Sequence, residues 1–372
     1  MSSPRILVVD DEVNMLRSVE RVLKSRYEVS IAATRAEALG ALREHEPQLA
    51  ILDIRMPEAD GFSLMGELRL ERPDLDVIFM TGAVHEIDSQ LIRAIREKAF
   101  YFIQKPFDRE VLLTIVERCL ELRRLAEENK RYVAELEAEL EAAVHFQRSL
   151  LPPAEGASGP LHFAGSYRPC AELGGDLYDW VGLGNGRLAF VLADVSGHGA
   201  AAAMLTSIVK SAFHAAEADG FAPASVVRHA AAAMAPFPVD KFVSLFCGLA
   251  RADEGRLEYV NAGHPAPLLR APDGQIRELT LTGPILSPVM VDVERVEESV
   301  RFAAGDSLFA YTDGLVEAKG TEGLFGEERL RELIGGAEAR GARLLREVES
   351  ELERFCAGRP LDDDCTLACV WS

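Results

Sequence analysis

Two groups of polar residues, each lying just beyond a short apolar run, are the parts of this sequence that could do chemistry. The first group comprises Asp10, Asp11, Asp53, Thr81 and Lys105. The second group lies in the other half of the chain and comprises Asp176, Asp194, Asp313 and Asp363. Carboxylates that meet in one crevice repel one another unless a cation lies between them. Both groups therefore predict sites for small, hard divalent cations, for which carboxylate oxygens are suitable ligands.

The elements expected around the first group are β-α repeats. The apolar runs that predict strands are Arg5–Val9, Val29–Ala32, Leu49–Leu52, Val77–Met80 and Tyr101–Ile103. Helical patterns separate them, so the sequence predicts an α/β, doubly wound, five-stranded parallel sheet. In such sheets ligands bind beyond the carboxyl ends of the strands, which is where the first group lies. Singly, each of these residues is typical of a turn or a surface, but five at matching strand ends favour a site.

The chemistry predicted for the first group is acceptance of a phosphoryl group. A Mg²⁺ ion would satisfy the carboxylates and leave positions open for phosphate oxygens. Asp53 is then placed to attack a phosphoryl donor, while Lys105 offsets charge on the transferred group.

The motifs ILVVDDE, LDIRMPEADGF, MTG and IQKPF resemble the receiver domain of bacterial response regulators over residues 1–121. The resemblance implies that Asp53 is the phospho-acceptor and that a sensor histidine kinase is the partner. It implies that Mg²⁺ is held by Asp11, Asp53 and the Arg55 carbonyl, with Asp10 assisting. It also implies a switch made of Thr81, Phe102 and Lys105, and often a cis peptide before Pro106. Lys98-Ala99 stands where many members have Gly-Ala.

Residues 122–151 predict a helical coiled-coil linker. No Gly interrupts residues 108–151, and helix formers dominate. A first series of inner positions follows a 4-3 spacing at Leu122, Leu125, Asn129, Tyr132 and Leu136. A second series continues after one extra residue at Leu140, Ala143, Gln147 and Leu150, which indicates a stutter. We expect a parallel homodimer with Asn129 fixing the register; a lone helix packed on its own domain is the alternative.

Residues 152–372 predict a second domain of a different class. Pro152, Pro153 and a Gly/Ser-rich stretch precede it. Its strands outnumber its helices and form hairpins, so we expect an α+β fold. Two metals held by the second acidic group could clamp a phosphate and activate a water molecule between them. No G-x-S-x-G or P-loop motif offers a competing chemistry.

The segments AELGGDLYDW, LADVSGHGAAAAM, NAGHP, YTDGLVEA and LDDDCT resemble the PPM family of metal-dependent serine/threonine phosphatases, in its sporulation and stress-response branch. The resemblance covers residues 145–372 and implies an αββα sandwich with two Mn²⁺ or Mg²⁺ ions. It implies that Asp194 bridges both metals with the Val195 carbonyl completing one shell. Asp313 and Asp363 would bind one metal and Asp176 the other or its waters. His198 as a general acid and Arg168 as a phosphate ligand stay open, and Ser287 replaces a Gly usual in its loop.

Composition excludes several other classes of function. A net charge of −20 over 372 residues argues against nucleic-acid binding, which needs a basic surface. No apolar run is long enough to predict a membrane span, and the N-terminus does not resemble a signal peptide. The six cysteines lack disulfide or zinc spacing, which favours free thiols in a reducing cytoplasm.

Together these features predict a two-component response regulator that dephosphorylates phosphoserine or phosphothreonine on a regulatory protein, under the control of Asp53 phosphorylation. The substrate expected from the resemblance is an anti-sigma-factor antagonist. The alternative is a non-catalytic adaptor that acts on a sigma-factor pathway by binding a partner. Loss of metal carboxylates would mark an adaptor, and all four are present. A DNA-binding output is disfavoured because no basic recognition helix follows the first domain.

Overall fold

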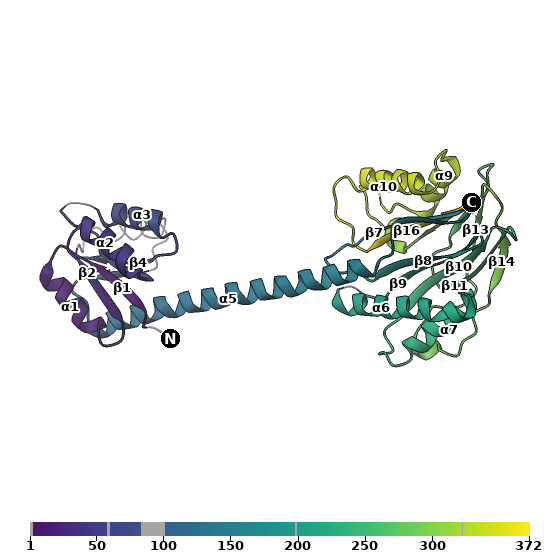
Figure 1. The fold of residues 1–372 in the computed structure, drawn as a ribbon. Coiled ribbons are helices and arrows are strands. Elements are labelled where there is room, and N and C mark those ends of the chain that lie inside the picture. Colours follow the sequence, from purple (N-terminus) through teal and green to yellow (C-terminus); the bar gives the residue numbers. More distant parts are fainter. Residues whose placement is uncertain (1–2, 58–59, 83–100, 198, 322) are drawn as a thin grey trace. The chain divides into compact units, whose positions relative to one another are not determined.

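The computed structural model describes residues 3–57, 60–82, 101–197, 199–321 and 323–372. The chain divides into two compact units, Met1–Leu136 and Glu137–Ser372 (Figure 1). Each unit has its own hydrophobic core and is described by itself.

The first unit is a parallel sheet covered by helices on both faces. Its strands are β1 (Arg5–Val9), β2 (Glu28–Ala32), β3 (Leu49–Asp53), β4 (Asp76–Thr81) and β5 (Tyr101–Gln104). The strand order is β2-β1-β3-β4-β5, and every pair is parallel. Helices α1 (Val13–Leu23), α2 (Arg35–His45) and α3 (Gly61–Glu71) connect the strands. The predicted doubly wound fold is confirmed.

The side chains of β1 show why helices cover both faces of the sheet. Ile6 and Val8 belong to the core that α1 and the start of α5 complete, whereas Leu7 and Val9 belong to the core with α2 and α3. Successive side chains of a strand point to opposite faces, so an uninterrupted apolar strand needs a helix on each side.

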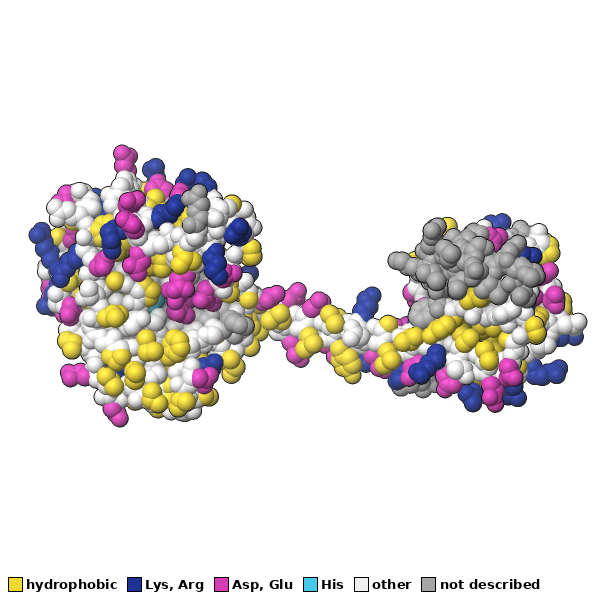
Figure 2. All heavy atoms as spheres, turned by 180° about the vertical axis from the view of Figure 1, so that it is seen from behind, with side chains coloured by type: hydrophobic (Ala, Val, Ile, Leu, Met, Phe, Trp, Pro, Cys, Tyr) yellow, Lys and Arg dark blue, Asp and Glu magenta, His cyan; other side chains and the backbone are white. Residues whose placement is uncertain are grey.

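Helix α5 (Arg109–Leu150) is 42 residues long and confirms the predicted helical linker. Its first turns bury Leu112, Val116 and Cys119 in the core of the first unit. Residues 129–142 are exposed all round, and Figure 2 shows hydrophobic side chains interleaved with charged ones along this stretch. The coiled-coil pairing itself stays a prediction.

One predicted inner position of that coiled coil is wrong. Gln147 is buried against its own domain, where its side chain is hydrogen-bonded to the backbone of Gly174. It therefore does not face a partner helix, because the last turn of α5 already packs on the fold that follows it.

The second unit contains two stacked antiparallel sheets. The first has the order β14-β11-β10-β9-β8 and the second the order β13-β12-β15-β16-β7-β6. The strands of the first sheet are β8 (Asp176–Gly184), β9 (Arg187–Val195), β10 (Val243–Arg251), β11 (Arg256–Ala262) and β14 (Glu298–Arg301). Those of the second are β6 (Glu155–Ser158), β7 (Leu161–Arg168), β12 (Leu268–Arg270), β13 (Ile276–Glu278), β15 (Ser307–Tyr311) and β16 (Cys365–Trp371).

Helices cover the outer face of each sheet, which confirms the predicted αββα sandwich. Helices α6 (Ala200–Ala215) and α7 (Pro223–Met234) pack on the first sheet (Figure 1). Helices α9 (Glu327–Gly336) and α10 (Ala342–Cys356) pack on the second. Aromatic side chains such as Phe163, Phe190 and Phe246 fill the space between the sheets. Short helices η1 (Ala216–Asp219), η2 (Pro288–Met290) and α8 (Asp313–Val316) complete the unit.

All six cysteines are free thiols and five are buried, as the sequence predicts. No helix in the described part of the chain combines the length and hydrophobicity needed to cross a membrane.

Candidate functional site

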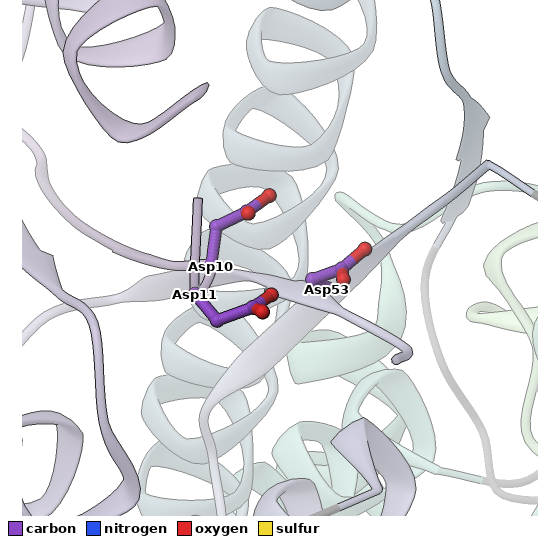
Figure 3. A group of neighbouring side chains, drawn as sticks. All are labelled: Asp10, Asp11 and Asp53. Atoms are coloured by element: carbon purple, nitrogen blue, oxygen red, sulfur yellow. The ribbon is translucent and has the colours of Figure 1, made fainter. Parts of the chain in front are cut away.

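The first acidic group gathers at the carboxyl ends of β1 and β3. Carboxylate oxygens of Asp10, Asp11 and Asp53 lie within 4.8 Å of one another (Figure 3). Asp10 is fully buried and Asp53 is 6% exposed, whereas Asp11 is exposed to solvent. Three hard oxygen donors at this spacing, with one side open, fit a Mg²⁺ ion that keeps positions for other ligands.

Lys105 offsets part of this negative charge. Its Nζ lies 2.6 Å from Asp10 Oδ2 and 2.8 Å from Asp53 Oδ1. Burial raises the pKa of Asp53, and the ion pair with Lys105 opposes this effect. Burial would lower the pKa of Lys105, but its bonds to Asp10 and Asp53 raise it overall. The lysine therefore stays charged next to the predicted phospho-acceptor.

The other predicted receiver residues lie around the same edge of the sheet. Thr81 ends β4 and is buried, and its carbonyl accepts a hydrogen bond from the Lys105 backbone N–H. Phe102 is half-buried on β5, beside Phe79 of β4. Arg55 is exposed two residues after β3. The Lys105–Pro106 peptide is cis, and Lys98-Ala99 lies outside the described residues.

The second acidic group lies where the two antiparallel sheets meet. Asp176 opens β8 and is directly opposite Asp194 near the end of β9. Asp194 in turn is opposite Ser244 of β10. Asp313 begins α8, directly after β15, and Asp363 lies just before β16. Four carboxylates are thus delivered by both sheets to one end of the sandwich.

Thr312 links the two sheets at this point. Its hydroxyl donates to Asp176 Oδ2 at 2.7 Å and accepts from the Thr366 backbone N–H at 2.9 Å. Its own backbone N–H donates to the Thr366 carbonyl. Because Thr312 is fully buried and adjoins Asp313, it fixes Asp176 relative to the start of α8.

The carboxylates of this group raise one another's proton affinity. Burial and the neighbouring Asp194 raise the pKa of Asp176 well above its usual value. Burial, Asp313 and Asp363 raise the pKa of Asp194 to about 7. Burial and Asp363 raise the pKa of Asp313. Buried acids without a compensating cation are unfavourable as anions, so this donor set suits divalent cations.

Two parts of the chain match models of known protein families. Residues 6–117 match the response regulator receiver domain. Residues 184–371, half of the chain, match Stage II sporulation protein E (SpoIIE). The chain belongs to the SpoIIE family. An N-terminal receiver domain is fused in it to a C-terminal SpoIIE/PP2C-type phosphatase domain.

Two relatives of this SpoIIE-family chain match about a third and about two thirds of it. The C4-dicarboxylate transport transcriptional regulatory protein DctD of Rhizobium meliloti (strain 1021) is 33% identical over 130 residues, 35% of this chain and 28% of DctD. Protein IcfG of Synechocystis sp. (strain ATCC 27184 / PCC 6803 / Kazusa) is 26% identical over 283 residues, 66% of this chain and 43% of IcfG. The chain thus spans less than half the length of these curated relatives.

A solved structure supports the fold of the second unit. The SiaA-PP2C domain of Pseudomonas aeruginosa superposes with a TM-score of 0.57 at 22% identity, covering 65% of this chain and 98% of that domain. At this identity the similarity concerns the fold alone.

Sequence reasoning missed several residues that build the phosphatase-domain site. Asp364 is buried and accepts hydrogen bonds from the backbone N–H groups of Cys170 (2.8 Å) and Gly175 (2.5 Å). Thr312 and Gln147 were also not identified as part of the site. The only signal for Asp364 was its place in the acidic run, which does not separate it from Asp363.

Three further residues considered in the sequence are Arg168, Ser287 and His198. Arg168 is paired with Glu353 and lines a cavity of about 450 Å³ together with Cys170 and Arg359. Ser287 is buried next to Leu286, which bridges to Val243 at the start of β10. His198 lies outside the described residues.

Proposed function

We propose that this chain is a two-component response regulator whose output is metal-dependent hydrolysis of phosphoserine or phosphothreonine on a regulatory protein. The observation that carries the proposal is the meeting of Asp176, Asp194, Asp313 and Asp363 at one end of the sandwich, three of them with raised pKa values. Perturbed acids without a cationic partner are typical of functional sites. Membership of the SpoIIE family supports the same reaction class.

The proposed roles follow from where each side chain lies. Divalent cations held here, Mn²⁺ or Mg²⁺, would supply Lewis acidity and water activation. Asp194 is opposite Asp176 and is also acted on by the charges of Asp313 and Asp363, which supports its proposed role as the residue that would share two ions. The Val195 carbonyl is the adjacent backbone ligand that the family resemblance implies. Thr312 holds Asp176 in place by its 2.7 Å hydrogen bond.

The receiver supplies the proposed control. Asp53 is the proposed phospho-acceptor from a sensor histidine kinase, with Mg²⁺ held by Asp10, Asp11, Asp53 and the Arg55 carbonyl. Lys105 would pair with the new phosphoryl group, because it already contacts Asp53. Thr81 and Phe102 are the proposed switch residues.

Two partners are proposed beyond the kinase. The substrate is a phosphorylated regulatory protein, and the sporulation and stress-response branch favours an anti-sigma-factor antagonist. The second partner is another copy of this chain, paired along α5. Leu122, Leu125 and Leu136 are 44%, 47% and 65% exposed in the single chain, although their spacing is that of a coiled-coil seam.

Turnover of an aryl phosphate in Mn²⁺ tests the proposal. Asp194→Asn should nearly abolish turnover without unfolding the protein, because loss of one shared ligand weakens both ions. Asp179→Asn is the control: Asp179 is a buried acid on β8, the strand next to that of Asp194, but it is paired with Lys210 and His214 outside the acidic group. More than a tenth of wild-type turnover in Asp194→Asn at saturating Mn²⁺ would reject the two-metal assignment. An inactive but folded wild-type protein would favour the adaptor alternative.

A further inference from the structure

A cavity that is lined by two arginines adjoins the acidic group of the phosphatase domain. Its volume is about 450 Å³, and it lies between the β7–β8 connection and the α10–β16 connection. Both connections lead to the acidic group, because the first ends at Asp176 and the second contains Asp363. The wall of the cavity also contacts this group, since the Cys170 N–H donates to Asp364 Oδ1 at 2.8 Å. A ligand in the cavity would therefore lie beside the candidate metal site.

Arg359, the first arginine of the cavity, is positioned by the turn that ends α10. Ala357 and Gly358 have φ angles of 50° and 84°, and the Arg359 N–H donates to the Cys356 carbonyl at 3.0 Å. Two left-handed residues in succession turn the chain sharply at the helix end. Arg359 Nη1 then donates to the Gly320 carbonyl at 3.0 Å, which holds the guanidinium. Within the part of the chain that the structure describes, no carboxylate forms an ion pair with it.

Arg168, the second arginine, comes from the last position of β7. It is opposite Cys365, the first residue of β16, and its guanidinium is paired with Glu353 of α10. The side chains of this pair are 38% and 61% exposed, and ion pairs of this kind contribute little to stability. The carboxylate of a ligand can therefore replace that of Glu353 at small cost.

The rest of the cavity is largely apolar. Leu352 and Cys356 line it from α10, and Pro360 and Leu361 line it from the connection to β16. An apolar cavity with a few polar groups is typical of ligand sites. Guanidinium groups pair with carboxylates through two parallel hydrogen bonds. The lining thus fits a peptide segment that carries an acidic side chain next to an apolar one.

We propose that this cavity binds the segment of the substrate beside its phosphoserine or phosphothreonine, and that it selects segments with acidic side chains. The inference rests on the proposed function, since it takes the neighbouring acids as the site of protein dephosphorylation. The net charge of the chain is −20, so the molecule as a whole repels an acidic phosphoprotein. Two arginines beside the metal site offset this repulsion where the substrate binds. They also provide selectivity, because a metal centre that binds only the phosphate does not distinguish one phosphoprotein from another.

Two phosphoserine peptides that differ only in flanking charge test the inference on the full-length protein in Mn²⁺. One has Glu and Leu on both sides of the phosphoserine, and the other has Lys and Leu. We expect kcat/KM of the wild type to be at least fivefold higher for the Glu peptide. In Arg359→Glu the ratio of the two kcat/KM values should fall at least tenfold.

Arg301→Glu is the matched control, because it makes the same charge reversal at an exposed residue of β14. Arg301 is opposite Arg256, at the other end of the sheet from Asp194. The ratio of the two kcat/KM values should stay within twofold of wild type in this variant.

A merely structural role of Arg359 would lower kcat/KM for both peptides by the same factor and leave their ratio unchanged, which would overturn the inference. A smaller preference in the wild type would overturn it as well. If Arg359→Glu does not fold, Arg359→Gln, which removes only the charge, should lower the ratio at least threefold.

A wild-type protein that hydrolyses neither the peptides nor an aryl phosphate would refute the proposed function instead. Without peptide turnover, the cavity is judged by fluorescence anisotropy of the same two peptides carrying a fluorescent label. At least fivefold tighter binding of the Glu peptide, lost in Arg359→Glu and kept in Arg301→Glu, would support the inference. Equal affinities for the two peptides would reject it.

Discussion

Buried acids in this protein are of two kinds, and the difference separates structural residues from candidate catalytic ones. Asp179 is buried but is paired with Lys210 and with His214. Asp176 is also buried and Asp194 is half-buried, and the charged groups that act on them are other carboxylates. A fold retains such a repulsive arrangement at a cost in stability, so the second kind indicates a site that a cation completes.

His264 gives the phosphatase domain a predictable response to acid. Its ring is fully buried, its Nδ1 lies 2.8 Å from Ser244 Oγ, and burial lowers its pKa to about 3. Below the unfolded-state pKa of about 6.5 the unfolded chain binds a proton that the folded chain does not, so this residue lowers stability as pH falls toward 3. Between pH 7.5 and pH 5 the loss should be about 2 kcal/mol.

Denaturant unfolding at the two pH values measures this effect. The free energy of unfolding of His264→Gln should differ from that of the wild type by the same amount at both pH values, apart from the change of about 2 kcal/mol, which it should lack. His145→Gln changes an exposed residue of α5, and its free energy of unfolding should keep the wild-type pH dependence. An unchanged pH dependence in His264→Gln would contradict the assignment.

Asp53 is predicted to be the single acceptor of a phosphoryl group. Incubation with acetyl phosphate and Mg²⁺ should add one acid-labile phosphoryl group, detected by mass spectrometry, because Asp53 is next to Lys105 and to two further carboxylates. Asp53→Asn should remove the label, while Asp108→Asn, at an exposed position before α5, should keep it. Labelling that persists in Asp53→Asn would place the acceptor elsewhere.

The sequence could identify residues whose neighbours in the chain explain them. Asp53 and Asp194 each stand at the end of an apolar run, so their position at a sheet edge was predictable. Gln147 and Asp364 were not predictable, because their partners are distant: Gly175 and Asp364 are 189 residues apart, and Gln147 and Gly174 are 27 apart. The glutamine even fitted a helical seam, since its periodicity does not say which surface it meets.

Among the elements, α5 has two different anchors within the first unit. Its first apolar turns, with Leu112 and Val116, pack on the sheet. Seven residues after Val116, Arg123 holds the helix to the edge of the sheet opposite Asp53. Arg123 Nη2 lies 2.7 Å from Asp74 Oδ2, and Nη1 lies 3.0 Å from Asp76 Oδ2. Nη1 also donates to the Asp74 carbonyl. These contacts fix the direction in which α5 leaves the receiver.

Arg123→Ala should therefore destabilise the receiver by roughly 1.5–3 kcal/mol, the range for hydrogen bonds to charged groups. Arg124→Ala is the control one residue away: Arg124 is 63% exposed and has a 3.5 Å pair with Glu128, so its loss should cost less than about 1 kcal/mol. Calorimetry of the full chain measures both. Equal melting temperatures for the two variants would show that Arg123 does not anchor the helix.

The sequence predicts individual strands better than it predicts which strands pair. All five receiver strands were predicted to within one or two residues, because each is a short apolar run between helices. Hairpins were also predicted for the second domain, and β10 with β11 forms one. The pairing of β7 with β16 was not, since it joins the two ends of the phosphatase domain without a turn between them. Only the family resemblance supplied the αββα arrangement.

For the molecule as a whole, the proposal requires that phosphorylation in one domain changes the other through α5. Phosphorylation of Asp53 adds nearly two negative charges at the sheet edge. Such a charge should draw in Thr81 and then Phe102, which lies on β5, a few residues before α5 begins. A helix that is continuous from Arg109 to Leu150 can transmit the change as a rotation or as a different pairing with a second copy.

A two-residue insertion after Glu137 tests whether α5 transmits or only tethers. Sedimentation equilibrium should first give a dimer for the wild type. Phosphorylation of Asp53 should then raise its phosphatase rate several-fold. Two extra residues turn one end of the helix relative to the other by about 200°, more than half a turn, and should abolish this dependence. Seven extra residues lengthen the helix by about 10 Å but nearly restore its phase, so that variant should keep much of the response. If both insertions respond fully to phosphorylation, the helix is a tether and the signal takes another route.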